Sequence, residues 1–451
     1  MAHQTDFLHN IRKELSSGAL WLDRAVVLAY AATAGLCVVG FTLLSNQAFA
    51  LFTRIQGVSP WLTLVWMPIG TALIVWLTRR FSPGAAGSGI PQVMAGLDPH
   101  LPVAERGRFV SLRLSLAKIV LSAGGLLAGL SLGREGPSVQ VAAGVMQHAQ
   151  RWLRPSSGIS RHALLVAGGA AGIAAAFNAP LAGVVFALEE LSRTLESRSS
   201  SLIITAIVLA GLVAVSTFGN MTYFGMIRVP PLGLHAVGSG VLVALVSGLA
   251  GGLFARLLIA SLTGSADRIN RWRRQQPVAF AALCGLAVAC IGGVAGGATY
   301  GAGSETVRQM LDGGTEMSAL FAPLKFLATW LTAWSGVPGG IFAPSLSIGA
   351  GIGQDIALLT HNADLATALI AMGMAGFLAA VTQAPLTSFI IVMEMVDGHA
   401  MVLSLMACAL LASLVSRLLC RSLYTALSES MLQGLTPAKP ASAAARDPAA
   451  R

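Results

Sequence analysis

Two charged residues, Arg134 and Glu135, stand between two long apolar segments, in the sequence GREGP at 133–137. An ionisable group at such a place is costly and usually functional. Pro137 suits the first turn of a helix, whose free N–H groups and positive dipole end attract an anion. We therefore expect the Glu135 carboxylate to compete for an anion site that the helix itself provides. The alternative is a charged loop at the membrane surface, with the Arg134 side chain extended towards water.

Two further segments have the same glycine and proline punctuation but no acid, GSGIP at 87–91 and GIFAP at 340–344. Small residues allow the backbone to approach a ligand closely, and Ser88 adds a neutral hydroxyl donor. Backbone N–H groups carry partial charges, which bind an anion weakly enough to release it. The three segments together predict a neutral, fast-exchanging anion site. Taken alone, GSGIP would also fit an ordinary capped helix start.

The elements that position these segments are predicted to lie in a membrane. Of the 451 residues 55% are hydrophobic and only 11% charged, which excludes an ordinary soluble protein. The net charge is +10, but the basic residues form short clusters between apolar runs, as in cytoplasmic loops, so no nucleic-acid partner is expected. We expect a cytosolic N-terminal helix at 1–20, a membrane domain at 21–434 and a disordered tail at 435–451.

The remaining chemistry-bearing residues predict neither a metal nor a cofactor. The eight histidines form no HExxH motif, and the five cysteines form no CxxC pair. A membrane-embedded enzyme with Glu135 as acid or base is a conceivable alternative. It lacks a nucleophile–base pair and a phosphate-binding loop, so we do not expect an enzyme.

An internal repeat divides the membrane domain into halves of about 21–230 and 231–434. The triplet APL at 179–181 recurs at 384–386, and the pattern GxxxPS at 133–138 recurs 207 residues later at 340–345. Paired Gly/Pro-broken segments are the sequence signature of a transporter's binding site. The pattern predicts an all-α polytopic membrane protein with many tilted and broken helices. The alternative is that Gly/Ala/Pro-rich helices simply look alike.

The three motifs, in this order and at these separations, resemble the signature loops of the CLC chloride channel and transporter family. The resemblance implies two inverted-topology halves and a homodimer in which each subunit holds its own pore. It also implies central chloride ligands, namely the hydroxyls of Ser88 and Tyr424 and the backbone amides of Ile341 and Phe342.

The resemblance further implies that Glu135 is the gating glutamate, which competes with chloride and carries a proton. Its neighbours Arg134 and Gly136 are expected to contribute to anion binding. Glu190 matches the internal proton-transfer glutamate of the family's antiporters. The chain departs from many relatives in having Gln92, instead of an acid, directly after GSGIP.

Adjacent Glu189 and Glu190 are predicted to differ in role. Glu189 has a repeat partner in Glu394, 205 residues later, whereas position 395 is Met. An acid kept in both halves is more simply structural, for example at a helix end, and directional proton delivery needs an acid that breaks the symmetry. The alternative is that both belong to a solvated, charged helix end.

These features predict exchange of chloride for protons across a bacterial inner membrane, with both termini cytoplasmic. The alternative function is a passive chloride channel of the same fold.

Overall fold

The computed structural model describes residues 18–192, 200–219, 222–227, 235–264, 267–313 and 317–435, and these fold almost entirely into helices. The first half contains α2 (Gly18–Val58), α3 (Thr63–Phe81), α4 (Ile90–Leu97), α5 (Leu112–Leu127), α6 (Glu135–His148), α7 (Arg161–Phe177), α8 (Pro180–Phe186) and α9 (Ser200–Phe218). The second half contains α10 (His235–Leu262), α11 (Arg268–Gln275), α12 (Pro277–Val294), α13 (Ser304–Leu311), α14 (Phe321–Ser335), α15 (Phe342–Leu359), α16 (Ala366–Thr382), α17 (Pro385–Met395), α18 (Val402–Arg417) and α19 (Leu423–Gln433). The predicted all-α class is confirmed, and no strand occurs within the described ranges.

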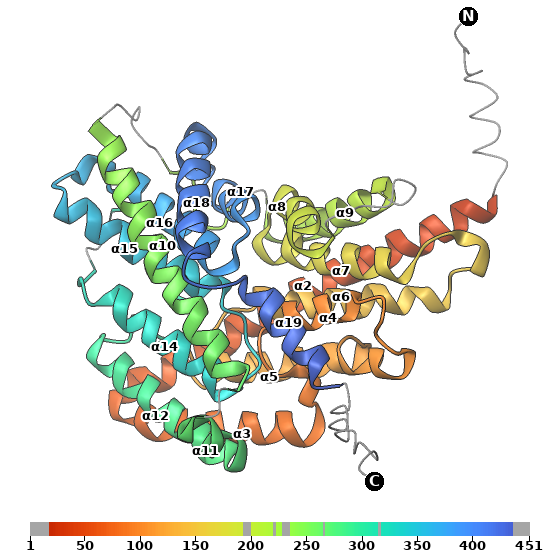
Figure 1. Ribbon diagram of the computed structural model, residues 1–451, viewed down its shortest axis with the longest axis horizontal. Helices are drawn as coiled ribbons and strands as arrows, with labels where there is room; N and C mark the ends of the chain where they lie inside the picture. The colour runs from red at the N-terminus through yellow and green to blue at the C-terminus, as the bar shows by residue number, and fades with distance from the viewer. Residues whose placement is uncertain are drawn as a thin grey trace, which may run out of the picture.

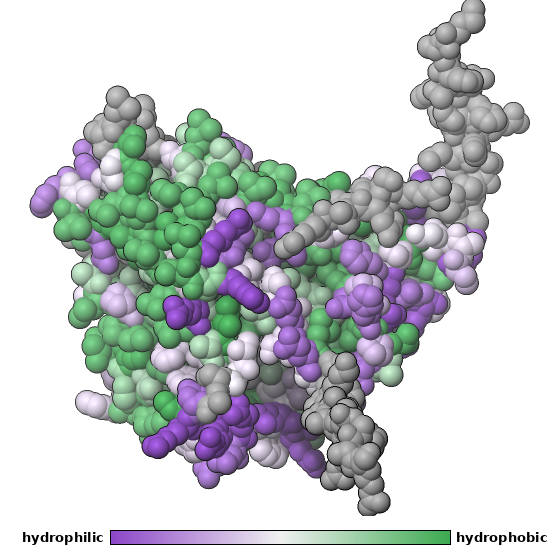
Figure 2. Space-filling model, in the orientation of Figure 1, coloured by the Kyte–Doolittle hydropathy of each residue, from purple (hydrophilic) through white to green (hydrophobic). Residues whose placement is uncertain are grey.

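Eight of the described helical segments are long and apolar enough to cross a membrane. Large apolar side chains on them face outwards, among them Leu116 at 66% and Ile69 at 63% exposed, and Figure 2 shows broad hydrophobic areas on the surface. Such exposure is costly in water and favourable in lipid. The chain is therefore a multi-pass membrane protein.

The helices vary widely in length. Helix α2 has 41 residues, so it is about 60 Å long, roughly twice the thickness of the hydrocarbon core of a bilayer. It continues through Arg54, where the apolar run is interrupted, and ends at Val58 before Pro60. By contrast, α4 has eight residues and α8 seven, and both have a proline in the first turn. The predicted mixture of long and broken helices is confirmed.

The two halves lie side by side in Figure 1, with α6, α7 and α9 on one side and α10, α15 and α16 on the other. Close packing within each half depends on glycine. A Cβ at Gly172 of α7 would lie 2.5 Å from the Ser138 carbonyl oxygen of α6, and a Cβ at Gly349 of α15 would lie still closer to the Gly373 carbonyl oxygen of α16. Helices α7 and α16 also end alike, in the left-handed residues Asn178 (φ 56°) and Gln383 (φ 60°).

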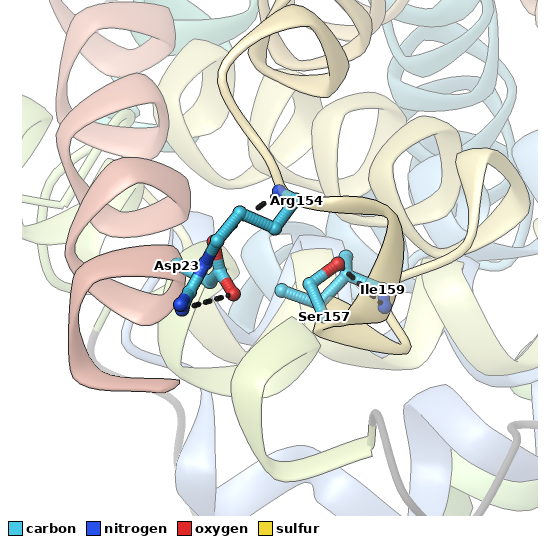
Figure 3. Close-up of polar contacts among 4 residues, drawn as sticks. All are labelled: Asp23, Arg154, Ser157 and Ile159. Carbon is cyan, nitrogen blue, oxygen red and sulfur yellow. Dashed lines mark hydrogen bonds and ion pairs between the residues drawn. The ribbon is translucent and has the colours of Figure 1, made fainter. Parts of the chain in front are cut away.

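An ion pair fastens α2 to the loop that precedes α7 (Figure 3). Arg154 Nη2 donates to Asp23 Oδ2 over 2.9 Å, and the Asp23 side chain is only 3% exposed. The Ser157 hydroxyl accepts from the Ile159 N–H at 3.3 Å, which stabilises the turn. The pair fixes the start of the longest helix against the first half. The predicted N-terminal helix lies outside the described residues except for 18–20, which begin α2, and the predicted tail lies outside except for Leu435.

Candidate anion and proton site

The three Gly/Pro loops meet at one junction. Gly133 and Gly340, which are equivalent in the repeat, form an antiparallel bridge in which each N–H donates to the other's carbonyl at 2.8 Å. The Gly339 N–H donates to the Gly87 carbonyl at 3.1 Å, which joins the loop at 87–91 to the same junction. A Cβ at Gly136 would lie 2.5 Å from the Ser88 hydroxyl oxygen, so only glycine fits there. The predicted convergence of the three motifs is thus present.

Each loop leads into a helix that begins at the junction, namely α4 at Ile90, α6 at Glu135 and α15 at Phe342. Ile341 is the residue that precedes the first turn of α15. The first N–H groups of a helix have no partner within the helix, and the dipole adds positive potential there. Helices α6 and α15 have 14 and 18 residues. Two full-length helices therefore begin at the junction. Such an arrangement can bind an anion without a cationic side chain.

The Glu135 carboxyl group occupies part of this electropositive point. The side chain is 1% exposed, and its carboxyl interacts with the backbone N–H groups of Arg134 and Ala343. Its Oε2 atom has no hydrogen-bond partner in the described part of the chain. The carboxyl therefore contacts the starts of both α6 and α15 while it keeps one oxygen unsatisfied. An anion that reached this point would compete with the carboxyl for the same N–H groups.

The Arg134 side chain turns away from the neighbouring acid. It donates to Asn46 Oδ1 and to the Tyr223 hydroxyl, the latter at 3.3 Å. The Tyr223 hydroxyl is in turn 3.1 Å from the Ser304 hydroxyl. No ion pair joins Arg134 to Glu135 within the described residues. Arg134 therefore lies beside the junction and orders its surroundings, and its predicted part in anion binding stays a prediction.

Two buried hydroxyls face a cavity of about 190 Å³, which we call the Ser88 cavity. Ser88 Oγ and the Tyr424 hydroxyl both line it and lie close enough to each other to interact, but neither makes a hydrogen bond of good geometry among the residues described. The Tyr424 ring stacks on Phe342, with ring centroids 6.0 Å apart, and Ile341 also lines the cavity. Buried hydroxyls are rarely left unsatisfied. Two hydroxyls that can both donate into one small cavity suit an acceptor such as a small anion.

A second cavity, of about 560 Å³, reaches the junction at Glu135, and we call it the Glu135 cavity. Its lining includes Asn46, Arg134, Tyr223 and Ser304. The two cavities have no lining residue in common. The loop junction thus separates them, and the carboxyl of Glu135 belongs to the barrier.

A buried lysine supports the loop that carries Ser88. Lys118 of α5 has no exposed surface, and its Nζ donates to the carbonyls of Ala85 at 2.8 Å and Gly87 at 2.6 Å. Gly87 (φ 74°) and Gly89 (φ 108°) are both left-handed, which a residue with a side chain rarely adopts. The amine therefore holds a loop whose shape requires glycine.

The second half contains a matching loop supported by a buried lysine, which sequence reasoning missed. Lys325 of α14 lies 207 residues after Lys118 and is equally buried, and its Nζ donates to the Thr299 and Gly301 carbonyls at 2.9 and 2.8 Å. Gly301 (φ 60°) and Gly303 (φ 83°) are left-handed, and α13 begins directly afterwards. The sequence contains a sign of this loop, because GAGS at 301–304 repeats the glycine spacing of GSGI at 87–90.

Gln92, the departure from the family pattern, supports the first loop. Its Oε1 accepts from the Gly89 N–H at 2.9 Å, and its Nε2 donates to the Ala86 carbonyl. An amide can do both at once, whereas an ionised acid can only accept. The residue therefore closes the turn around Ser88 from both sides, and the departure leaves the loop geometry intact.

The adjacent glutamates have different surroundings. The Glu189 carboxylate accepts from the N–H groups of Leu386 at 3.1 Å and Thr387 at 2.6 Å, at the start of α17. Its repeat partner Glu394 accepts reciprocally from Leu181 at 3.2 Å and Ala182 at 2.6 Å, at the start of α8. Each half thus caps a helix of the other half, as expected of an acid kept in both.

Glu190 is half-buried in a π-helical segment, Ala187–Leu191, which follows α8 directly. The Tyr424 hydroxyl lies within electrostatic range of both Glu190 and Glu135. The six predicted residues Ser88, Glu135, Gly136, Ile341, Phe342 and Tyr424 therefore meet at the junction, and Glu190 lies within electrostatic range of Tyr424. The described residues contain no group of three His, Cys, Asp or Glu that could hold a metal ion.

Comparison with known proteins gives consistent matches. The family model described as voltage gated chloride channel matches residues 70–417. The H(+)/Cl(-) exchange transporter ClcA of Cronobacter sakazakii is 30% identical over 86% of this chain and 84% of its own length. The ClcA of Vibrio parahaemolyticus is 31% identical over 82% of this chain and 80% of its own length.

Solved structures agree with these matches. A slow cyanobacterial Cl−/H+ antiporter superposes with a TM-score of 0.77 at 25% identity, over 92% of this chain and 98% of that protein. A CLC-type fluoride/proton antiporter gives a TM-score of 0.72 at 20% identity, over 90% of this chain and 97% of that protein, and this likeness concerns the fold alone.

Proposed function

The chain belongs to the voltage gated chloride channel family, and from that premise we propose that it is a secondary-active antiporter that exchanges chloride for protons. Relatives of about 30% identity that align over most of their length are named as H(+)/Cl(-) exchange transporters. These are transport proteins, and we infer that this chain is a transporter and not an enzyme.

The observation that carries the proposal is the place of the Glu135 carboxyl. It interacts with N–H groups at the starts of α6 and α15, at the junction between the Ser88 cavity and the Glu135 cavity. A carboxylate and a chloride ion seek the same donors at such a helix start. Protonation removes the negative charge, weakens the hold of the carboxyl on those donors and lets chloride take its place. One side chain thereby links proton uptake to anion movement.

Chloride is proposed to bind on the other side of the barrier, between the hydroxyls of Ser88 and Tyr424. Their unpartnered oxygens and the backbone of Ile341 support this site, with the amides of Ile341 and Phe342 as further ligands. All these donors are neutral, so the ion exchanges quickly. The loop that holds Ser88 is kept in shape by Lys118 and Gln92 without either side chain entering the site.

Protons are proposed to reach Glu135 from Glu190. Tyr424 lies near both acids, so both groups border the same region of the protein. Glu190 is half-buried, which suits an acid that exchanges protons with water and passes them inwards. The proton and chloride routes then share the junction and diverge on the Tyr424 side.

The proposal also includes the assembly and its location. The family resemblance implies a homodimer with one pore per subunit, in a lipid bilayer that we take to be the bacterial inner membrane, with both termini cytoplasmic. Chemical cross-linking in membranes tests the dimer, and protease access to tagged termini tests their side.

Flux in liposomes tests the function. Purified protein is reconstituted, a chloride gradient is imposed without a pH gradient, and external pH is recorded while a potassium ionophore clamps the voltage. We expect chloride flow to drive protons uphill in the opposite direction. Chloride flow without proton movement would instead identify a passive channel of the same fold, and no chloride flow would contradict both functions.

A further inference from the structure

The Ser88 cavity contains one charged side chain, that of Arg273. Every other residue that lines it is apolar or neutral, including Ser88, Tyr424 and Ile341. Arg273 comes from α11, a helix of eight residues between α10 and α12. Its Nη2 would be 4.0 Å from a Cβ at Gly336, where the loop towards Ile341 begins. A full positive charge therefore borders the same space as the two unpartnered hydroxyls.

Helix α11 is held so that Arg273 faces inwards. Asn270, three residues earlier and hence on the same helix face, is buried and accepts from Trp334 Nε1 at 3.1 Å. The Trp334 ring packs on Phe280 of α12, with centroids 4.9 Å apart. Arg273 itself donates from Nη1 to the Ser261 carbonyl at the end of α10, at 3.1 Å. The guanidinium is thus anchored at one nitrogen.

The rest of the guanidinium is available to a ligand. In the described ranges Nη1 alone of its nitrogens has a hydrogen-bond acceptor, and no ion pair to an acid occurs. The charged groups that act on Arg273 at close range are Arg79 and Arg274, both basic, and the nearby Cys284 is a neutral thiol. Figure 2 shows hydrophilic residues gathered where Figure 1 places α11. The local potential is therefore positive and uncompensated, which attracts small anions.

We propose that Arg273 is an anion-capture residue, which binds chloride through its free Nη2 group on the way between solution and the Ser88 site. This role rests on the proposed chloride transport but is separate from proton coupling. An arginine in direct contact with the central site would hold the ion too long. At the edge of the cavity, half-buried, it raises the local chloride concentration and still releases the ion. A fixed charge at this range changes occupancy severalfold, and salt screens part of the effect.

Tracer chloride exchange in liposomes, with equal chloride on both faces, tests the proposal. Arg273→Gln is compared with Arg274→Gln, which removes the same charge from the exposed side of the same helix. We expect Arg273→Gln to raise the half-saturating chloride concentration about three- to tenfold with the maximal rate kept within twofold. Arg274→Gln is expected to stay within twofold on both measures, and Arg273→Lys to recover most of the loss. Raising ionic strength with an impermeant gluconate salt should reduce the difference between wild type and Arg273→Gln.

Equal half-saturation in Arg273→Gln and Arg274→Gln would overturn the proposal. So would a lower maximal rate at unchanged half-saturation, because that pattern indicates a structural role. Proton movement by the wild type is recorded in the same liposomes, so a protein that exchanges chloride without protons would contradict antiport and leave the Arg273 comparison valid. If the wild type moves no chloride, calorimetric chloride titration decides, and unchanged affinity in Arg273→Gln overturns the role.

Discussion

The loops Ala85–Gly89 and Thr299–Gly303 have the same scaffold and offer different chemistry to an anion. In each, a buried lysine donates to two carbonyls, two left-handed glycines shape the turn, and a helix of eight residues follows. The first loop places a free hydroxyl, that of Ser88, between its glycines, whereas the second has Ala302 there. The scaffold occurs in both halves, but only the first copy carries a hydroxyl that can donate to an anion.

The same contrast recurs at the junction. Gly133 and Pro137 have repeat partners in Gly340 and Pro344, which keep the backbone alike. Glu135, by contrast, is matched 207 residues later by Phe342, which stacks on Tyr424. Positions kept in both halves thus build the frame, and positions that differ supply the proposed gate and ligands. We infer that a repeated frame with one-sided chemistry suits the coupled movement of two different ions.

The largest effect on transport is expected at Glu135, where one half has an acid and the other has Phe342. Glu135→Ala should abolish chloride-driven proton movement while chloride still passes, because no carboxyl then competes for the N–H groups of Arg134 and Ala343. Proton and chloride fluxes in liposomes provide the measurement. Phe342→Leu, at the matched position, is the control and should keep proton coupling. If a pH gradient still drives chloride exchange in Glu135→Ala, Glu135 is not the residue that couples the two ions.

Substitutions of Lys118 and Lys325 are expected to affect stability alike but chloride binding differently. Lys118→Met and Lys325→Met each leave two carbonyls without a donor, so each should lower unfolding stability by about 1–3 kcal/mol. Thermal unfolding in detergent measures this. Lys118→Met alone should also weaken chloride binding, by about threefold or more on the same estimate, because its loop carries Ser88 and the other carries Ala302. Equal loss of chloride affinity in both variants would mean that the two loops are not functionally distinct.

The smallest effect is expected from single hydroxyls. Ser88→Ala and Tyr424→Phe each remove one neutral hydrogen bond, worth about 0.5–1.5 kcal/mol, so chloride affinity should fall about tenfold or less. Titration calorimetry measures it. Ala302→Ser, the matched change in the other loop, should leave the affinity unaltered. Complete loss of binding in either hydroxyl variant would show that the backbone amides are not the main ligands.

Sequence reasoning predicted the parts of this arrangement in which glycine and proline dictate local backbone. It found the loops at 87–91, 133–137 and 340–344, the repeat, and the paired acids Glu189 and Glu394. It missed the loop at 299–303 because only the two glycines are retained there. It also missed Arg273, because Asn270, Trp334 and Ser261 decide which way that side chain points, and these contacts join three helices. The inverted topology of the halves stays a prediction, which the antiparallel pairing of Gly133 with Gly340 supports.

Adjacent acids provide the sharpest test that symmetry-breaking residues carry the protons. Glu189→Gln removes a helix cap that Glu394 repeats in the other half, so it and Glu394→Gln should each lower stability by about 1 kcal/mol. Both should keep proton coupling.

The decisive measurement is chloride-driven proton uptake in liposomes that contain Glu190→Gln or Glu189→Gln, recorded side by side with chloride flux. We predict that Glu190→Gln moves chloride without protons and that Glu189→Gln moves both. Proton coupling that survives in Glu190→Gln and disappears in Glu189→Gln would contradict the account.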